Sequence, residues 1–194
     1  MTADRPSSFG DAVGVSPVFV VVSGPPGSGK STLAVPLAEQ LGLPLIAKDT
    51  IKEALMTALG APDVERSRHL GAAAVQVMLG VAAASPIGAV IESNLRKSVA
   101  VAELDRLPGR IVEIFCRCDP VTSRARYAAR AGTRHAGHFD EQRTESELWS
   151  GEVAEPVAGG WPLLEIDTSQ TVDLAIVVAY VRQQINEGPP RERA

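Results

Sequence analysis

The chain has 194 residues, of which 45% are hydrophobic and 22% are charged, and its formal net charge is −4. This length suits one α/β domain with a sizeable core. The negative balance gives no general attraction for nucleic acid or an acidic membrane, although it is compatible with a local basic patch. No apolar run approaches the roughly 20 residues that a membrane-spanning helix needs, and the first residues carry no signal-peptide pattern. We therefore expect a cytoplasmic protein without membrane or nucleic-acid partners.

The two ends of the chain lack regular apolar spacing. Residues 1–16 are rich in Pro, Ser and Gly and predict a disordered leader, and residues 188–194 predict a flexible tail. A single domain should therefore span residues 17–187.

A strand, a glycine-rich loop and a helix are predicted in succession between residues 18 and 41. The β-branched run 18–22 leads into GPPGSGKS, which fits the phosphate-loop pattern G-x-x-x-x-G-K-[ST] in its required strand-to-helix context. Glycines let such a loop turn tightly, so that its N–H groups and the helix N-terminus can bind phosphate oxygens. The residues predicted to bind nucleotide here are Gly24, Gly27, Ser28, Gly29, Lys30, Ser31 and Thr32.

Two side chains of this loop have predicted chemical roles. Lys30 should reach the β- and γ-phosphates and act in catalysis, while the Ser31 hydroxyl should bind Mg²⁺. A chance glycine turn is the alternative, but the pattern and its structural context agree independently.

The rest of the chain alternates predicted strands with predicted helices. Strands are predicted at 45–47, 89–91, 110–116 and 163–166, and helices at 50–58, 67–84, 98–106, 120–132 and 172–187. Between 132 and 162 periodicity is weak, and only a helix over 141–149 is predicted. This alternation predicts an α/β fold of three layers, in which a five-stranded parallel sheet is flanked by helices.

Carboxylates follow three of the predicted strands, at the sheet edge where ligands of parallel sheets collect, namely Asp49, Glu92 and Asp167. Asp49 is the candidate catalytic base or hydroxyl-orienting group, with an N-cap of the following helix as the alternative. Glu92 is a candidate for holding Mg²⁺ or for bonding the acceptor, with a solvated strand-end glutamate as the alternative.

Sulfur and imidazole groups give weaker signals. Cys116 and Cys118 alternate faces on a predicted strand, which disfavours a disulfide and indicates reduced thiols with a packing role. His135 and His138 have no cysteine or third histidine nearby, so we interpret them as lid or surface residues.

The sequence resembles the small P-loop kinases, a group that includes shikimate, gluconate and nucleoside-monophosphate kinases. Within the group it is most similar to chloramphenicol phosphotransferase and the zeta-toxin-like kinases. The resemblance covers residues 18–187 and is carried by the phosphate loop and by the segments 48–52, 92–94 and 118–130. It implies ATP with Mg²⁺ as donor and a lid, roughly residues 124–140, that closes over the phosphates. The resemblance leaves the acceptor open.

Arginines follow in the segment that resembles the lid. Arg126 and Arg130 lie one helical turn apart, so they share a face and suit the charge of a transferring phosphoryl group. We expect both to be catalytic and Arg126 also to bind nucleotide, whereas Arg124 should point elsewhere. A solvated basic helix face is the alternative. The resemblance also places Thr168 against the adenine.

The acceptor site is predicted from residues at the strand ends and on the helices beside them. Lys52, one turn after Asp49, is either an acceptor ligand or an exposed helix lysine. The residues predicted to bind the acceptor are Asp49, Lys52, Glu92, Asn94 and Arg134.

The composition of the acceptor region favours a neutral acceptor. No Phe, Tyr or Trp lies between Phe19 and Phe115, which disfavours base stacking and therefore a nucleotide acceptor. The helices there supply apolar residues and few charges, which favours a small hydroxyl-bearing acceptor that is neutral or weakly charged. These apolar residues are Leu55, Met56, Leu59, Val75, Val77, Met78 and Leu79.

Together these patterns predict an ATP-dependent kinase that transfers the γ-phosphoryl group to a hydroxyl of a small molecule. A GTPase would carry an N-K-x-D motif, which is absent. Two alternatives stay open: a nucleotide or nucleotide-sugar kinase of zeta-toxin type, and a regulatory module that binds ATP without turnover. The sequence leaves the oligomeric state open.

Overall fold

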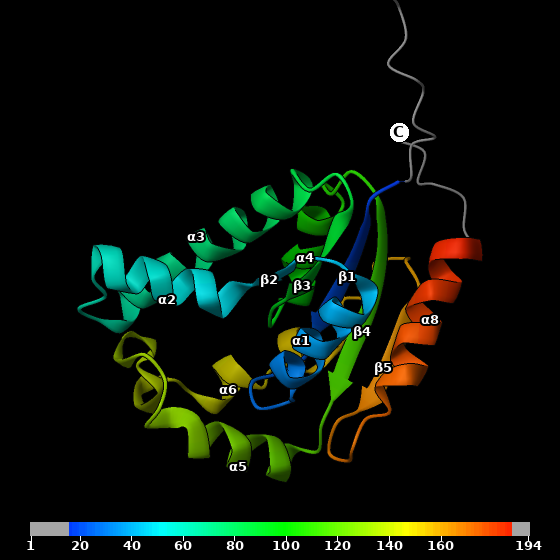
Figure 1. Cartoon of the computed structure of the whole chain (residues 1–194). Helices are drawn as coiled ribbons and strands as arrows, with labels where there is room; N and C mark the ends of the chain where they lie inside the picture. Colours follow the sequence, from blue (N-terminus) through cyan, green and yellow to red (C-terminus); the bar gives the residue numbers. More distant parts are fainter. Residues whose placement is uncertain (1–15, 188–194) are drawn as a thin grey trace, which may run out of the picture.

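The computed structural model describes residues 16–187, so the predicted tail and almost all of the predicted leader lie outside the described residues. Five strands form one parallel sheet in the order β2-β3-β1-β4-β5 (Figure 1). The strands are β1 (Val18–Ser23), β2 (Leu45–Ala47), β3 (Gly88–Glu92), β4 (Arg110–Arg117) and β5 (Leu163–Asp167). The predicted five-stranded α/β architecture is confirmed.

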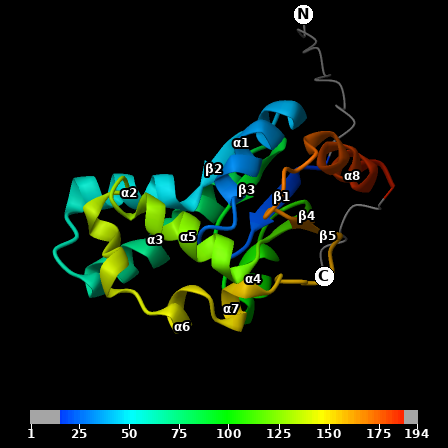
Figure 2. The ribbon, with the colours of Figure 1, turned by 90° about the horizontal axis from the view of Figure 1, so that it is seen from below.

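Helices connect the strands and cover both faces of the sheet. They are α1 (Lys30–Leu41), α2 (Lys48–Leu59), α3 (Val64–Ala83), α4 (Lys97–Leu104), α5 (Pro120–Ala131), α6 (Glu145–Leu148), α7 (Gly151–Ala154) and α8 (Leu174–Glu187), with 3₁₀ turns η1 (Ala136–His138) and η2 (Asp140–Gln142). Figure 2 shows α1 and α8 on one face of the sheet and α4 on the other.

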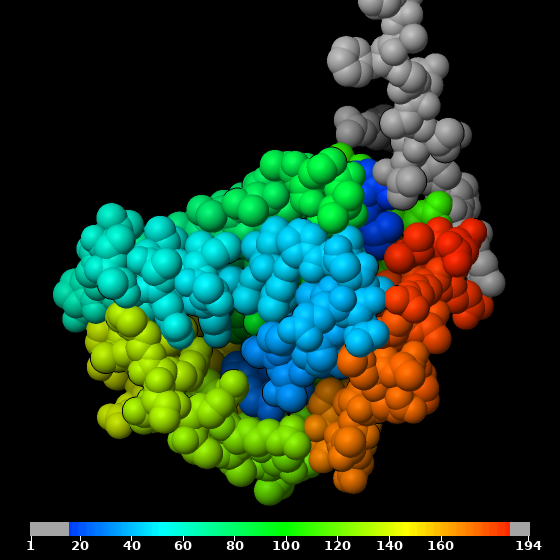
Figure 3. Space-filling model, viewed as in Figure 1, coloured from blue at the N-terminus to red at the C-terminus, as the bar shows by residue number. Residues whose placement is uncertain are grey.

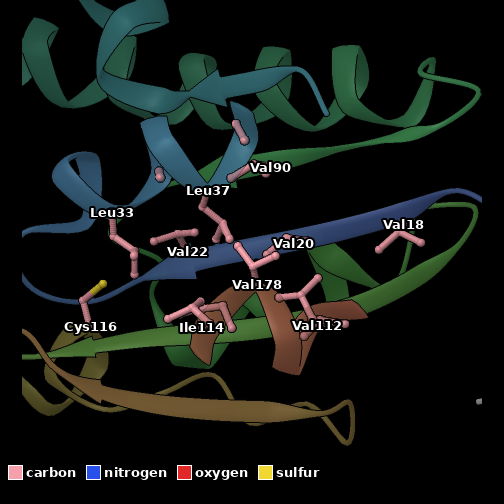
Figure 4. Packing of buried hydrophobic residues seen from close by; sticks show 14 residues of the cluster. Val18, Val20, Val22, Leu33, Leu37, Val90, Val112, Ile114, Cys116 and Val178 are labelled. Carbon is pink, nitrogen blue, oxygen red and sulfur yellow. The ribbon is translucent and has the colours of Figure 1, made fainter. Parts of the chain in front are cut away.

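The central strand β1 organises the core because both of its faces are buried. Val18, Val20 and Val22 pack against α1 and α8, where Leu37 and Val178 meet them (Figure 4). The alternate residues of β1, which point to the opposite face, pack against α3 and α4. This two-sided burial fixes β1, and with it the loop that follows.

Several helix bounds differ from the predictions, and side-chain caps explain two of the differences. The helix predicted at 141–149 is divided into η2 and α6, because the Thr144 side chain accepts a hydrogen bond from the Glu147 backbone N–H (3.3 Å) and starts a new helix. Helix α3 begins three residues before the predicted start, since the Asp63 carboxylate caps it by accepting from the Arg66 N–H (2.7 Å).

The cysteines are free thiols, as predicted. Burial raises the pKa of the Cys116 thiol to about 12, which suits a packing role in the core. Within residues 16–187, none of the helices is long and apolar enough to cross a bilayer.

A fully buried carboxylate ties β4 to the chain that leads into β5. Glu113 accepts hydrogen bonds from four buried or part-buried donors. They are the Ser23 hydroxyl (2.9 Å), the backbone N–H groups of Val157 (2.9 Å) and Ala158 (3.0 Å), and the Trp161 indole (3.1 Å). This carboxylate therefore links the end of β1 to the segment before β5.

Replacing Glu113 with alanine would remove the acceptor that these donors share, and each buried polar group that loses its only partner costs roughly 1–3 kcal/mol. We expect Glu113→Ala to lower the free energy of unfolding in urea by about 3 kcal/mol or more. The exposed Glu141→Ala is the control and should change it by less than about 0.5 kcal/mol. Equal stability of the two variants would contradict this structural role.

Candidate active site

The phosphate loop, residues 24–31, leaves β1 at its carboxyl end and enters α1 directly. Gly27 and Gly29 have φ values of +78° and +81°, which side chains rarely adopt. A Cβ atom at Gly27 would also lie 2.0 Å from the Ser123 carbonyl oxygen, so only glycine allows α5 to approach the loop this closely. The Ser28 hydroxyl is buried and has no hydrogen-bond partner among the described residues. The loop thus has the tight backbone that phosphate binding requires.

Lys30 is buried at the start of α1, and its ammonium group donates a hydrogen bond to the Pro25 carbonyl (3.0 Å). Burial lowers the pKa of Lys30, and the charges of Glu92 and Asp49 oppose this effect. A cation is therefore held inside the loop, next to carboxylates.

Glu92 ends β3, which lies beside β1, and only 7% of it is exposed. The solvated strand-end interpretation is therefore wrong. Burial raises the pKa of Glu92, and the Lys30 charge opposes this. Glu92 and Ser31 line the same small cavity beside the loop. The two predicted metal ligands thus lie together and offer oxygen atoms of the kind that Mg²⁺ prefers.

Asp49 lies in the first turn of α2, whose N-cap is Ala47, so the N-cap interpretation of Asp49 is wrong. Its carboxylate forms ion pairs with the ammonium of Lys48 (2.9 Å) and with Nη2 of Arg134 (3.2 Å). Although burial disfavours the charged form, these two partners prevail and hold the pKa of Asp49 well below its ordinary range. Asp49 is thus a persistent carboxylate beside Lys30 and Glu92.

Arg134 links α2 to the segment that follows α5. Besides Asp49, it pairs with Asp140 (2.9 Å) and donates to Nδ1 of His138 (3.1 Å). His138 Nε2 in turn bonds Glu53 of α2 (2.8 Å). His138 is only 5% exposed, so the surface interpretation of this residue is wrong. Burial and the Arg134 charge lower the pKa of His138, in keeping with a neutral ring that accepts from Arg134 and donates to Glu53.

The arginines of α5 point in two different directions, as the helical spacing predicts. Arg126 donates to the Thr168 carbonyl (2.9 Å), so these two predicted nucleotide ligands contact each other. Arg130 lines both cavities beside the phosphate loop. Arg124 points elsewhere, pairing with Glu145 (2.9 Å).

Two cavities border the loop, and a third extends from one of them. One of about 680 Å³ lies between α1, α5 and the chain after β5, and its lining includes Gly29, Thr32, Arg126 and Thr168. A small cavity of about 80 Å³ contains the charged cluster; its lining includes Lys30, Ser31, Asp49, Glu92, Asn94, Arg130 and Arg134. A third cavity of about 610 Å³ extends from it between α3 and α4. In Figure 3 the dark blue atoms near the start of the loop are visible in a recess between α1 and α5.

Comparison with known proteins identifies the family to which this chain belongs. Residues 19–149 match a family described as an AAA domain. A “putative kinase” from Chloroflexus aurantiacus J-10-fl is 33% identical and superposes with a TM-score of 0.79, over 87% of this chain and 98% of that chain. The chain belongs to the small P-loop kinase family.

More distant solved structures share the fold of this family. A gluconokinase from Sinorhizobium meliloti 1021 has 22% identity and a TM-score of 0.55, over 87% of this chain and 91% of its own. A shikimate kinase from Acinetobacter baumannii, in complex with shikimate, has 18% identity and a TM-score of 0.58, over 90% and 95%. Among curated proteins, none matches this sequence.

Several residues of the site were not predicted. Lys48, Tyr127, Asp140, Arg143 and Leu148 also line the small cavity. Only Lys48 had a signal in the sequence, namely its place beside Asp49 at a strand end. The others come from α5 or the segment 132–162, whose weak periodicity gives no indication of where it packs.

Trp149 also belongs to this segment and covers the phosphate loop. Its indole N–H donates to the Pro26 carbonyl (3.2 Å), and its ring meets Tyr127 edge-on, with ring centroids 5.3 Å apart. Since Trp149 contacts the loop directly, its environment should depend on what the loop binds.

We therefore expect Mg²⁺·ATP to change the tryptophan fluorescence, and the Trp149→Phe variant to lose this change. The other tryptophan, Trp161, is buried in the core and serves as an internal control. Calorimetry should still detect ATP binding to Trp149→Phe. A full fluorescence change in that variant would show that the signal arises elsewhere.

Proposed function

We propose that this member of the family transfers the γ-phosphoryl group of ATP to a hydroxyl of a small-molecule acceptor. The observation that carries the proposal is that the phosphate-loop lysine, two strand-end carboxylates and two arginines line one cavity. These residues are Lys30, Asp49, Glu92, Arg130 and Arg134. Phosphoryl transfer needs mainly positioning and charge neutralisation, and this cavity contains groups suited to both.

The donor nucleotide would occupy the 680 Å³ cavity with its phosphates on the loop. Thr32, Arg126 and Thr168 line this cavity, and Arg126 is already oriented by its bond to the Thr168 carbonyl. Arg130 borders both this cavity and the charged one, where the transferring phosphoryl group would lie. Arginines in this position can neutralise the negative charge on the oxygens of the transferring phosphoryl group.

The residues present fit a magnesium ion. The Ser31 hydroxyl and the Glu92 carboxylate are oxygen donors that line one small cavity beside the loop, and these two residues would hold it. When bound, the ion would neutralise phosphate charge.

Asp49 would orient the acceptor. Because Lys48 and Arg134 keep its carboxylate ionised, it can accept a hydrogen bond from an incoming hydroxyl. A carboxylate stabilised in this way is a weak base, which suits an orienting role more than early proton removal. The Asn94 side-chain oxygen accepts a hydrogen bond from the Lys48 ammonium group (3.0 Å), so Asn94 also borders the place where the acceptor hydroxyl would lie.

A screen of hydroxylated metabolites and antibiotics for acceptor-dependent ADP release tests the proposal. We expect release with at least one acceptor class, and its loss in Lys30→Ala together with weaker triphosphate binding, since that variant loses the cation of the loop. A regulatory module would bind ATP with no acceptor-dependent release. Efficient use of nucleotides or nucleotide sugars would favour the zeta-toxin alternative, and normal turnover by Lys30→Ala would refute the site.

Asp49→Asn separates chemistry from binding. We expect the rate to fall by about 100-fold or more, since a misplaced reacting group costs roughly this much, with little change in ATP affinity by calorimetry. The matched control is Asp63→Asn, an exposed cap of α3 outside the site, which should keep full activity. If Asp49→Asn loses only folding stability, Asp49 has a structural role.

A further inference from the structure

The charged cavity and the 610 Å³ cavity share a wall. Lys48, Lys52, Asn94 and Arg143 line both of them. The larger cavity departs from the sequence prediction, because only Val75 of the seven apolar residues expected there lines it. Its basic residues are Lys48, Lys52, Arg68, Arg96 and Arg143, and its acidic ones are Glu103 and Glu147. The acceptor side of the site is thus more basic than the local sequence indicated.

Lys52 is the most unusual of these residues. It is only 5% exposed, so the exposed-lysine interpretation is wrong, and within the described chain its ammonium group has no hydrogen bond or ion pair. Its stem passes Gly71 of α3, where an added Cβ would lie 3.6 Å from the Lys52 Cε atom. Burial, with the charges of Lys48 and Arg143, lowers the pKa of Lys52 to about 8, so it is still mainly charged at pH 7. The stem of Lys52 is buried, whereas its ammonium group reaches the cavities that Lys52 lines. Charged groups with perturbed pKa values cluster at functional sites.

Two further donors near Lys52 also lack acceptors. Arg143 pairs through Nη2 with Glu147 (3.0 Å), but its Nε and Nη1 atoms are buried without a hydrogen-bond partner among the described residues. Glu147 is shared, since Arg68 binds it as well (3.0 Å). The Ser67 hydroxyl of α3 is fully buried and equally without a partner there.

These donors belong to the acceptor side of the site. Ser67 lines the larger cavity and not the charged one, whereas Lys52 and Arg143 stand between the two. A ligand group bound by all three would therefore lie beyond Asp49 as seen from the phosphate loop. Ammonium, guanidinium and hydroxyl donors without acceptors together match the oxygens of an anion.

Building on the proposed function, we propose that Lys52, Arg143 and Ser67 bind an oxyanion of the acceptor, a carboxylate or a phosphate, while the acceptor hydroxyl meets Asp49. This departs from the neutral acceptor that the sequence favoured. The acceptor would be a hydroxy acid or a phosphorylated alcohol that is long enough to reach from Asp49 in the charged cavity to Ser67 in the larger cavity.

Matched pairs of compounds test this proposal: hydroxy acids against their methyl esters, and sugar phosphates against the free sugars. We expect ADP release with either the hydroxy acids or the sugar phosphates, and little with the corresponding neutral compounds. The class that reacts shows whether the site binds a carboxylate or a phosphate. Lys52→Met should raise the KM for that acceptor by about tenfold or more, as for loss of a charged hydrogen bond, with the KM for ATP and kcat nearly unchanged. The exposed Lys97→Met is the control and should leave all three constants unchanged. Equal use of both members of every pair, or an unchanged KM in Lys52→Met, would overturn the proposal.

A binding measurement separates failure of this proposal from failure of the kinase proposal. The same compounds and inorganic phosphate are titrated calorimetrically into protein saturated with Mg²⁺ and a non-hydrolysable ATP analogue, which fills the phosphate loop. Anion binding by wild type but not by Lys52→Met, without turnover of any compound, would support the oxyanion site and refute the kinase. Absence of anion binding to wild type would refute the site.

Thermal unfolding shows whether Lys52→Met is folded and whether Lys52 has a structural role instead. Because the variant removes a partly desolvated charge that has no ion-pair partner among the described residues, we expect its Tm to rise by about 2–4 °C. A lower Tm together with unchanged acceptor KM would mean that Lys52 only supports the fold.

Discussion

The ion pair between Asp49 and Arg134 is the constraint on which the candidate site depends. It joins the first turn of α2 to the segment after α5 across a distance of 3.2 Å, and Asp140, His138 and Glu53 continue the same network. This network keeps the Asp49 carboxylate ionised and covers the charged cavity with residues from the second half of the chain.

The fold and half of the site could be predicted from the sequence because both follow from local rules. Alternating strands and helices require a parallel sheet, and a parallel sheet brings the ends of β1, β2 and β3 to one edge, where Asp49 and Glu92 meet the phosphate loop. The glycine pattern of the loop is equally local.

The rest of the site depends on how segments far apart in the sequence pack together, and hydrophobic periodicity does not predict such packing. Arg143 and Asp140 lie in a segment of short helices and 3₁₀ turns, so their approach to α2 had no signal in the sequence. The burial of Lys52 also had no signal in the sequence, because it depends on the neighbouring α3 and on the space at Gly71. The neutral acceptor was inferred from the residue types between Phe19 and Phe115, which do not show that Lys48, Lys52, Arg68 and Arg96 line one cavity. Figure 2 shows α2, α3, α5 and α6 on the same side of the molecule.

We propose that this cavity passes the phosphoryl group of ATP to an acceptor and not to water. Quantifying ADP, free phosphate and phosphorylated acceptor in one reaction, the last by mass spectrometry, tests this proposal. We expect ADP and phosphorylated acceptor in equal amounts, with little free phosphate. ADP that is matched by free phosphate, at a rate independent of any acceptor, would refute it.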